Sequence, residues 1–295
     1  MHISKQFGAC GVALVSPFTE KGRIDFNALS MLCSSLIEKG IDYLVALGTT
    51  AETPTLSKQE KGDILRCIID ANQGRVPIMA GAGGNDTRAA VEAIKALPVN
   101  GLHGVLSVAP YYNKPGQEGL YQHFSSLAAV SDLPLVLYNV PGRCAVNMSA
   151  NTVLRLAHDH DGIIAIKEAS GDMQQVSDII REMPAGFKVF SGDDADALPM
   201  IALGASGLIS VIGNVYPGQL SAMVHDALQG KWDAARNMHH RLSPMMRAIF
   251  REGNPAGIKA ALALQGKIEN VLRLPLTPVT LQLEEEIAGL MTDLC

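Results

Sequence analysis

The chain has no long basic run, no long apolar run and no clustered cysteines, and each absence excludes a class of protein. Without a block of Lys and Arg, a chain of net charge −5 lacks the electrostatic footprint of a nucleic-acid-binding protein. No apolar stretch approaches the roughly 18 residues that a membrane-spanning helix needs. Met1–Gln6 also lack the basic, apolar and small-residue regions of a secretory signal. The sequence therefore predicts no nucleic-acid partner and no membrane partner.

Cysteines are few and scattered: Cys10, Cys33, Cys67, Cys144 and Cys295 never form a CxxC pair, and their number is odd. This usage argues against a disulfide framework and against a zinc site. It is typical of the reducing cytoplasm, which is the localisation that we expect.

Short apolar runs rich in β-branched residues alternate with stretches of helical periodicity. Runs that are apolar at consecutive positions suit strands buried on both faces of a parallel sheet. Eight βα units predict an α/β fold of the (β/α)₈ TIM-barrel type. An open doubly wound sheet is the alternative, but Gly81–Gly84 lacks the third glycine of a GxGxxG motif. The eight runs are Cys10–Val15, Tyr43–Leu47, Val76–Ala80, Gly104–Val108, Leu135–Tyr138, Ile163–Lys167, Phe187–Ser191 and Gly207–Val211.

Helix boundaries are marked by capping residues. Ser57 and Glu60 form the pattern of a capping box, and Asp86 can cap the next helix. Gly40, Gly74 and Gly230 stand where helices should end.

The residues after the eighth run contain no further strand signal and predict helices only. Pro244 should kink or split the second of these helices. We therefore expect a catalytic barrel over residues 1–230 and a small C-terminal helical domain over residues 231–295. The predicted helices are Ser221–Gln229, Trp232–Phe250, Asn254–Gln265 and Thr280–Asp293.

Lys167 is the most informative polar residue, because chemistry in such a barrel sits where the strands end. It follows Ile163–Ile166, a run with no other polar side chain. A partly desolvated ammonium loses its charge more easily, and a neutral amine can form a Schiff base with a carbonyl. The alternative is a lysine that pairs with Glu168 or extends to solvent.

Polar residues also close the neighbouring strands. The Tyr138 phenol can carry a proton, although a core tyrosine is the plainer interpretation. Thr49 and Thr50 offer hydroxyls and backbone N–H groups to a small carboxylate, or simply form a turn. Arg143 can hold a second carboxylate, or can form a surface ion pair.

Two acidic clusters resemble metal sites but have simpler explanations. His158–Asp161 falls at a predicted helix end, on the face of the barrel opposite the chemistry, and we interpret it as solvated. In Asp193–Asp196, Asp193 or Asp194 is expected to cap the next helix. The sequence predicts no metal.

Five segments begin at or near the ends of predicted strands: Gly48–Glu52, Pro110–Pro115, Tyr138–Arg143, Ile166–Ala169 and Ser191–Asp194. Together they resemble the 4-hydroxy-tetrahydrodipicolinate synthase family, which belongs to the pyruvate-dependent Schiff-base aldolases. The resemblance runs from about Gly8 to Pro278, and the motifs occur in the family's order. One departure is Ala51, where the family usually has glycine.

The resemblance implies a role for each matching residue. Lys167 would form a Schiff base with pyruvate, and Thr49, Tyr138 and Tyr112 would relay protons. The pyruvate carboxylate would bind Thr50. L-aspartate-4-semialdehyde would be the second substrate, and its carboxylate would bind Arg143. Gly192 and Ile209 would supply backbone carbonyls near the site. No metal or dissociable cofactor would be needed, because the covalent Schiff base is the electron sink.

The resemblance also implies an assembly and a regulatory question. Tyr112 would reach across a dimer interface, in a dimer of dimers.

The family's L-lysine site commonly carries histidines where Lys58 and Lys61 stand and a glutamate where Ala89 stands, so we expect no lysine inhibition here. Glu92 is the possible substitute for that glutamate. By position the site would comprise Thr53, Pro54, Lys58, Lys61, Asn85, Ala89 and Tyr111.

Two other functions remain open at this point. N-acetylneuraminate lyase and the sugar-acid aldolases share the lysine and the tyrosine but differ where Arg143 and Tyr112 stand. A non-catalytic sensor of 2-oxo acids would not need Lys167 and Tyr138 together.

Overall fold

The computed structural model describes residues 7–294, and eight parallel strands form a closed barrel within it. Each strand pairs with the next in sequence order, and β8 pairs with β1. The predicted TIM barrel is confirmed. The expectations for Met1–Gln6 and Cys295 lie outside the described residues. The strands are β1 (Cys10–Ala13), β2 (Tyr43–Ala46), β3 (Ile78–Gly81), β4 (Gly104–Val108), β5 (Leu135–Asn139), β6 (Ile163–Glu168), β7 (Lys188–Ser191) and β8 (Gly207–Ser210).

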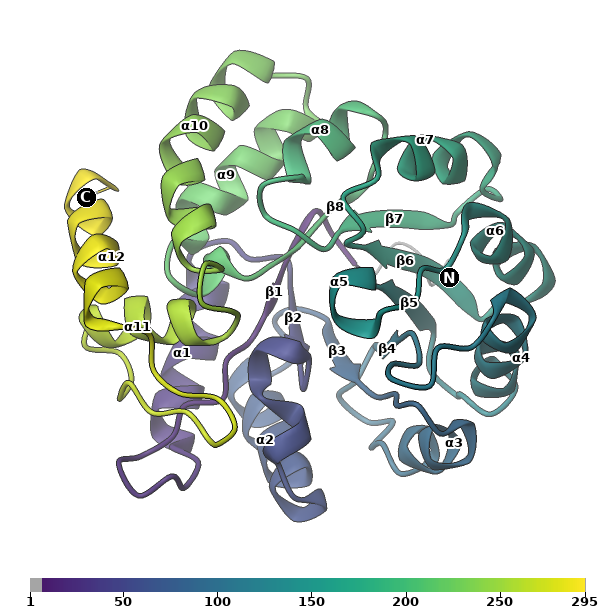
Figure 1. Ribbon diagram of the computed structural model, residues 1–295, viewed down its shortest axis with the longest axis horizontal. Coiled ribbons are helices and arrows are strands. Elements are labelled where there is room, and N and C mark those ends of the chain that lie inside the picture. The colour runs from purple at the N-terminus through teal and green to yellow at the C-terminus, as the bar shows by residue number, and fades with distance from the viewer. Residues whose placement is uncertain (1–6, 295) are drawn as a thin grey trace.

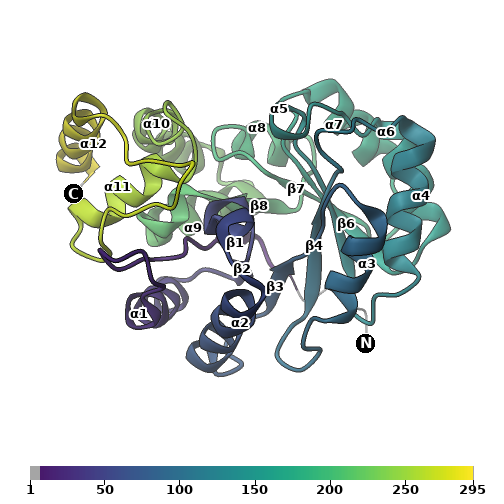
Figure 2. The same ribbon diagram turned by 60° about the horizontal axis from the view of Figure 1, so that its bottom comes forward.

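Helices surround the strands on the outside, as Figures 1 and 2 show. Their order alternates with that of the strands, so each strand is covered by the helix that follows it. They are α1 (Phe26–Glu38), α2 (Lys58–Asn72), α3 (Thr87–Lys95), α4 (Gln117–Ala128), α5 (Pro141–Cys144), α6 (Ala150–Asp159), α7 (Met173–Glu182), α8 (Ala197–Ala202) and α9 (Pro217–Leu228).

The predicted capping residues match the structure, although the bounds of the predicted C-terminal helices differ by up to four residues, as where α9 begins at Pro217 and not at Ser221. Ser57 accepts from the backbone N–H of Glu60, whose carboxylate accepts from the Ser57 N–H, so the capping box is confirmed. Asp86 caps α3 through the N–H groups of the first turn. The glycines predicted to end helices have a φ of 71° to 86°, as a left-handed turn after a helix requires; these are Gly40, Gly74 and Gly230.

Several strand ends differ from the prediction by one or two residues, and the start of β3 differs for a clear reason. The sequence pattern predicts a strand from Val76, but β3 begins at Ile78. The Val76 N–H donates to Asn72 Oδ1, and the Val76 carbonyl accepts from Asn72 Nδ2. The N–H and the carbonyl of Val76 therefore bond to the last residue of α2 and do not take part in the sheet.

Aromatic side chains fill the interior of the barrel. The Tyr43 ring is fully buried, with its centroid 5.3 Å from that of Phe7 and 5.9 Å from that of Phe190. Gly11 on β1 makes room for it, since a Cβ there would lie 2.2 Å from the Tyr43 ring. Because side chains fill the interior, we expect the active site in the loops at the carboxyl ends of the strands.

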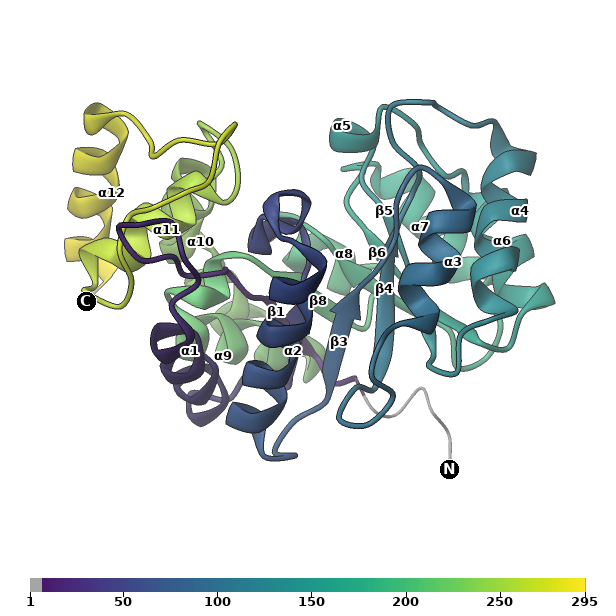
Figure 3. The ribbon, with the colours of Figure 1, turned by 90° about the horizontal axis from the view of Figure 1, so that it is seen from below.

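Three further helices follow the barrel: α10 (Trp232–Ala248), α11 (Ala256–Leu264) and α12 (Leu281–Leu294). Figures 1 to 3 place them on the side of the barrel away from α3, α4 and α6. Of the two predicted effects of Pro244, a split is wrong, because α10 runs through Pro244 unbroken, and a kink stays a prediction. Leu242 and Met245, buried on either side of Pro244, hold the helix together by packing. The domain boundary at residue 230 stays a prediction. Within residues 7–294, no helix has the length and apolar character to cross a membrane.

Candidate active site

Lys167 and Tyr138 lie side by side at the carboxyl ends of neighbouring strands. The register of β5 and β6 pairs the two residues, and Lys167 Nζ lies 4.4 Å from the centroid of the Tyr138 ring. Only 5% of Lys167 and 7% of Tyr138 is exposed. Lys167 therefore does not extend to solvent, which was one alternative for it.

Burial changes the protonation of Lys167. Burial lowers the pKa of the ammonium, the negative charge of Asp194 opposes this and the positive charge of Arg143 adds to it, and the resulting pKa is about 8. An amine with this pKa is partly neutral near pH 7, and the neutral form has the lone pair that attacks a carbonyl. The burial of Lys167 therefore favours the neutral amine that the predicted Schiff-base chemistry needs.

Tyr138 connects this amine to the loop after β2. Burial raises the pKa of the Tyr138 phenol, while a hydrogen bond with the Thr49 side chain and the charge of Arg143 lower it. Thr49 begins the 3-10 turn η2 (Thr49–Ala51). A phenol that is hydrogen-bonded to a hydroxyl can pass a proton along that bond.

Two residues predicted to bind carboxylates contact the same asparagine. Thr50 is buried, and its Oγ1 accepts a hydrogen bond from Asn254 Nδ2 at 3.0 Å. Arg143, exposed on α5, donates from Nη2 to the Asn254 carbonyl at 3.2 Å. Asn254 precedes α11, and the sequence pattern marks it only as the start of a predicted helix, not as a site residue.

Gly192 packs directly against the Lys167 side chain. A Cβ at Gly192 would lie 2.7 Å from Ala169 Cβ and 3.1 Å from Lys167 Cε, so a larger residue would displace the lysine. The Gly192 N–H also donates to the Glu168 carbonyl at 2.7 Å. Ile209 lies on β8, with its side chain buried in the same apolar cluster as Tyr138.

Tyr112 is the predicted site residue that this chain does not bring into the site. It lies in the loop between β4 and α4, with a φ of 73°, and 88% of it is exposed. Its phenol therefore faces away from the barrel of its own chain.

Glu168 does not pair with Lys167, which was the other alternative for the lysine. Successive side chains of a strand point to opposite faces. The buried Glu168 carboxylate instead accepts hydrogen bonds from Asn139 Nδ2, the Ser170 N–H and Gln175 Nε2. Burial raises its pKa, and these bonds lower it. Because Asn139 follows Tyr138, these contacts join the ends of β5 and β6.

Asp194 is a further residue whose role the sequence pattern missed. It is buried and accepts from Ser210 Oγ and from the N–H groups of Val211 and Ile212, so it joins the ends of β7 and β8. Burial raises its pKa to about 6. The predicted helix cap is wrong, because α8 has Asp196 at its start and receives no side-chain cap.

Metal-binding geometry is not found among residues 7–294, where no group of three or more His, Cys, Asp or Glu side chains surrounds a common point. In the His158–Asp161 segment, His160 Nε2 contacts Ser125 Oγ and His158 Nε2 contacts the Glu182 carbonyl. Those nitrogens already have partners.

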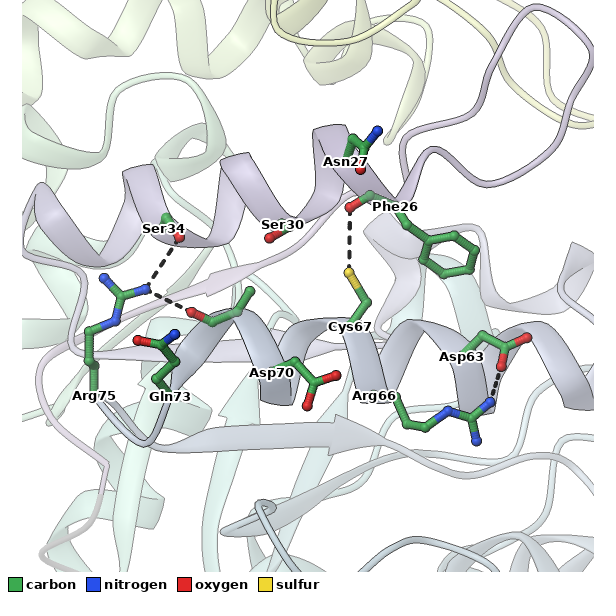
Figure 4. Close-up of a pocket in the computed structure, with 11 residues that line it drawn as sticks. Phe26, Asn27, Ser30, Ser34, Asp63, Arg66, Cys67, Asp70, Gln73 and Arg75 are labelled. Atoms are coloured by element: carbon green, nitrogen blue, oxygen red, sulfur yellow. Dashed lines mark hydrogen bonds and ion pairs between the residues drawn. The ribbon is translucent and has the colours of Figure 1, made fainter.

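An open groove of about 790 Å³ lies elsewhere, between α1 and α2. Figure 4 shows Ser34, Cys67 and Arg75 along it, with Arg75 hydrogen-bonded to Ser34 Oγ. None of the predicted site residues lines this groove.

Comparisons with known proteins agree on one family, and the matches cover nearly the whole chain. The model of the dihydrodipicolinate synthetase family matches residues 6–294. The 4-hydroxy-tetrahydrodipicolinate synthases of Parabacteroides distasonis and Phocaeicola vulgatus are each 50% identical to the chain. The first match covers 96% of both chains, and the second covers 99% of this chain and 98% of the relative.

Solved structures show the same fold. The dihydrodipicolinate synthase of Thermotoga maritima superposes with a TM-score of 0.95 at 37% identity, over 98% of each chain. The enzyme of Cyanidioschyzon merolae, solved with lysine bound, superposes with a TM-score of 0.95 at 38% identity, over 99% of each chain.

Proposed function

The chain belongs to the dihydrodipicolinate synthetase family, and we propose that Lys167 carries out that family's chemistry at the mouth of the barrel. The enzyme condenses pyruvate with L-aspartate-4-semialdehyde to give 4-hydroxy-tetrahydrodipicolinate. It is a lyase of lysine and diaminopimelate biosynthesis. The observation that carries the assignment of the nucleophile is the buried Lys167 amine against Tyr138.

The reaction begins when the Lys167 amine attacks the keto carbon of pyruvate and the keto oxygen leaves as water. Tyr138 supplies a proton to the keto oxygen and removes one from the attacking nitrogen, and its hydrogen bond with Thr49 carries these protons onward. Loss of a methyl proton converts the protonated Schiff base into an enamine, whose carbon attacks the aldehyde. The amino group of the semialdehyde then replaces the Lys167 nitrogen, which closes the ring and frees the enzyme.

Substrate binding is divided between two carboxylate sites. Thr50, buried beside the strand ends, binds the carboxylate of pyruvate, and Arg143, exposed at the mouth, binds that of the semialdehyde. Backbone carbonyls of Gly192 and Ile209 complete the site. The reaction uses no metal and no dissociable cofactor, because the protonated Schiff base on Lys167 accepts the electrons.

The proposed assembly is a dimer of dimers in the cytoplasm, each chain having its helical domain over residues 231–295. The exposure of Tyr112 supports this assembly, since a phenol facing away from its own barrel can reach a neighbouring one. In that arrangement Tyr112 of each chain ends the proton relay of the other.

A panel of aldehydes, each supplied with pyruvate, tests the substrate assignment. L-aspartate-4-semialdehyde should give a kcat/KM at least about a hundredfold above that of N-acetylmannosamine or a sugar-acid aldehyde, because Arg143 matches its carboxylate. The rates are measured by pyruvate consumption. A preference for a sugar aldehyde would instead assign the chain to the aldolases related to N-acetylneuraminate lyase, and Schiff-base formation without turnover would indicate a sensor.

L-lysine should not inhibit the enzyme. An effector ammonium taken out of water needs a carboxylate, and Ala89 on α3 offers none, while Lys58 adds positive charge. Glu92, the possible substitute, is exposed, and its Oε1 lies 3.4 Å from Lys95 Nζ. Loss of one charge-assisted contact weakens binding by more than about tenfold. We expect unchanged initial rates as L-lysine rises, and clear inhibition below about 1 mM would refute the prediction.

A further inference from the structure

Asn254 contacts both of the residues that we assign to substrate carboxylates. Its side-chain amide donates to Thr50 Oγ1 at 3.0 Å, and its backbone carbonyl accepts from Arg143 Nη2 at 3.2 Å. Only 7% of Asn254 is exposed. The residue comes from the segment between α10 and α11, which lies outside the barrel sequence.

The direction of the first bond determines what Thr50 can do. A hydroxyl has one proton and two lone pairs, whereas an amide nitrogen donates and does not accept. Because Asn254 Nδ2 already donates to Thr50 Oγ1, the Thr50 proton cannot be directed back to that nitrogen. The proton is left to point elsewhere, and a carboxylate oxygen is the acceptor that benefits most from it.

Residues after the barrel also contact the rest of the loop after β2, which carries Thr50. Glu52, two residues after Thr50, has a φ of 53° and is buried. Its Oε1 lies 2.5 Å from Lys259 Nζ on α11, and its Oε2 accepts from the Arg273 N–H at 2.9 Å. A buried ion pair of this geometry fixes the relative position of its two backbones. Asn254 therefore meets Thr50 across a rigid contact between α11 and the loop after β2.

We propose, on the basis of the function proposed above, that Asn254 is a positioning residue that orients the Thr50 hydroxyl as a donor to pyruvate. The helices after the barrel thereby set the affinity of the enzyme for its first substrate. Arg143 is positioned by the backbone carbonyl of Asn254, which is present whatever side chain stands at position 254. Substitution of Asn254 should therefore change the affinity for the second substrate far less than the affinity for pyruvate.

The test is borohydride trapping with pyruvate alone, over a range of pyruvate concentrations, with intact mass as the readout. Asn254→Ala should raise the half-saturating pyruvate concentration about tenfold, because it removes one directed hydrogen bond. Asn254→Asp should raise it on the order of a hundredfold, because the new carboxylate takes the Thr50 proton and repels pyruvate. The KM for the semialdehyde should change less than about threefold in Asn254→Ala.

A double-mutant cycle isolates the contact without needing the aspartate variant to fold. Thr50→Val with Asn254→Ala should bind pyruvate no more weakly than Thr50→Val alone, because the hydroxyl to be oriented is gone. Asn72→Ala is the matched control: it removes a buried asparagine that bonds the Val76 backbone at the far end of α2, and it should leave pyruvate trapping unchanged.

Each contrary outcome has a distinct meaning. Half-saturating pyruvate within twofold of wild type in Asn254→Ala, or fully additive effects in the cycle, would overturn the inference. Equal effects of the alanine and aspartate variants would overturn the assigned direction of the hydrogen bond. Failure of the wild-type chain to trap pyruvate on Lys167 would overturn the proposed function instead.

Discussion

Replacing Lys167 with alanine should lower the condensation rate by on the order of a thousandfold or more, because the variant has no nucleophile to form the Schiff base. Lys167→Ala removes a side chain whose amine end lies over the Tyr138 ring, at the edge of the barrel core. The fold should survive, as a circular dichroism spectrum can show. Treatment of the wild-type chain with pyruvate and borohydride should add one reduced pyruvate, and the variant should gain none.

Lys259 provides an internal control for this assignment. Burial lowers its pKa to about 8, as it does for Lys167, although the Glu52 carboxylate raises it. Lys259 Nζ lies 2.5 Å from Glu52 Oε1 and also donates to the Val271 carbonyl, so its lone pair is not available to a ketone. Peptide mapping should find the label on Lys167 only. A label on Lys259 would show that a depressed pKa, and not the position at a strand end, selects the reactive lysine.

The pH dependence of trapping gives a second control. The neutral amine attacks, so at low pyruvate concentration the initial rate should rise about tenfold per pH unit below the pKa of Lys167 and level off above about 8. A rate that keeps rising toward pH 10 would indicate an unperturbed lysine as the nucleophile.

Residues at the ends of strands were predictable from the sequence, and the reason is geometric. A parallel barrel directs every strand end to one face, so a polar residue after an apolar run must lie on that face. Lys167 and Tyr138 satisfy this rule, and their pairing follows from the neighbouring order of β5 and β6. The rule needs only local patterns, which periodicity reveals.

Residues that depend on contacts between distant segments were not predictable in this way. Asn254 and Thr50 are 204 positions apart in the chain, and no local pattern joins them. Asp194 finds its partners on the neighbouring strand, at Ser210 and beyond, only after β7 and β8 are in register. One signal did exist: Lys259 is the only charged residue in the otherwise apolar helix α11, and a buried charge requires a partner.

Tyr112 is the site residue that a single chain leaves unexplained. Its φ of 73° places a tyrosine in the left-handed region, which costs on the order of 1–3 kcal/mol and persists only where surrounding contacts impose it. Asn113 supplies one such contact, since its Nδ2 donates to the Asn85 carbonyl at 2.8 Å. The loop therefore holds an exposed phenol outward in a defined position, which supports the proposal that another chain receives it.

Two inactive variants should restore activity to each other if Tyr112 serves the neighbouring site. Tyr112→Phe alone should lower kcat by on the order of a hundredfold, because the relay loses its last proton carrier. In a hybrid dimer with Lys167→Ala, one site has both Lys167 and Tyr112 intact and the other has neither. Random pairing of equal amounts makes half of the dimers hybrids, so about a quarter of wild-type activity should return. Native mass spectrometry verifies the exchange. Hybrids without restored activity, or a fully active monomer in sedimentation, would show that Tyr112 does not serve the site of a neighbouring chain.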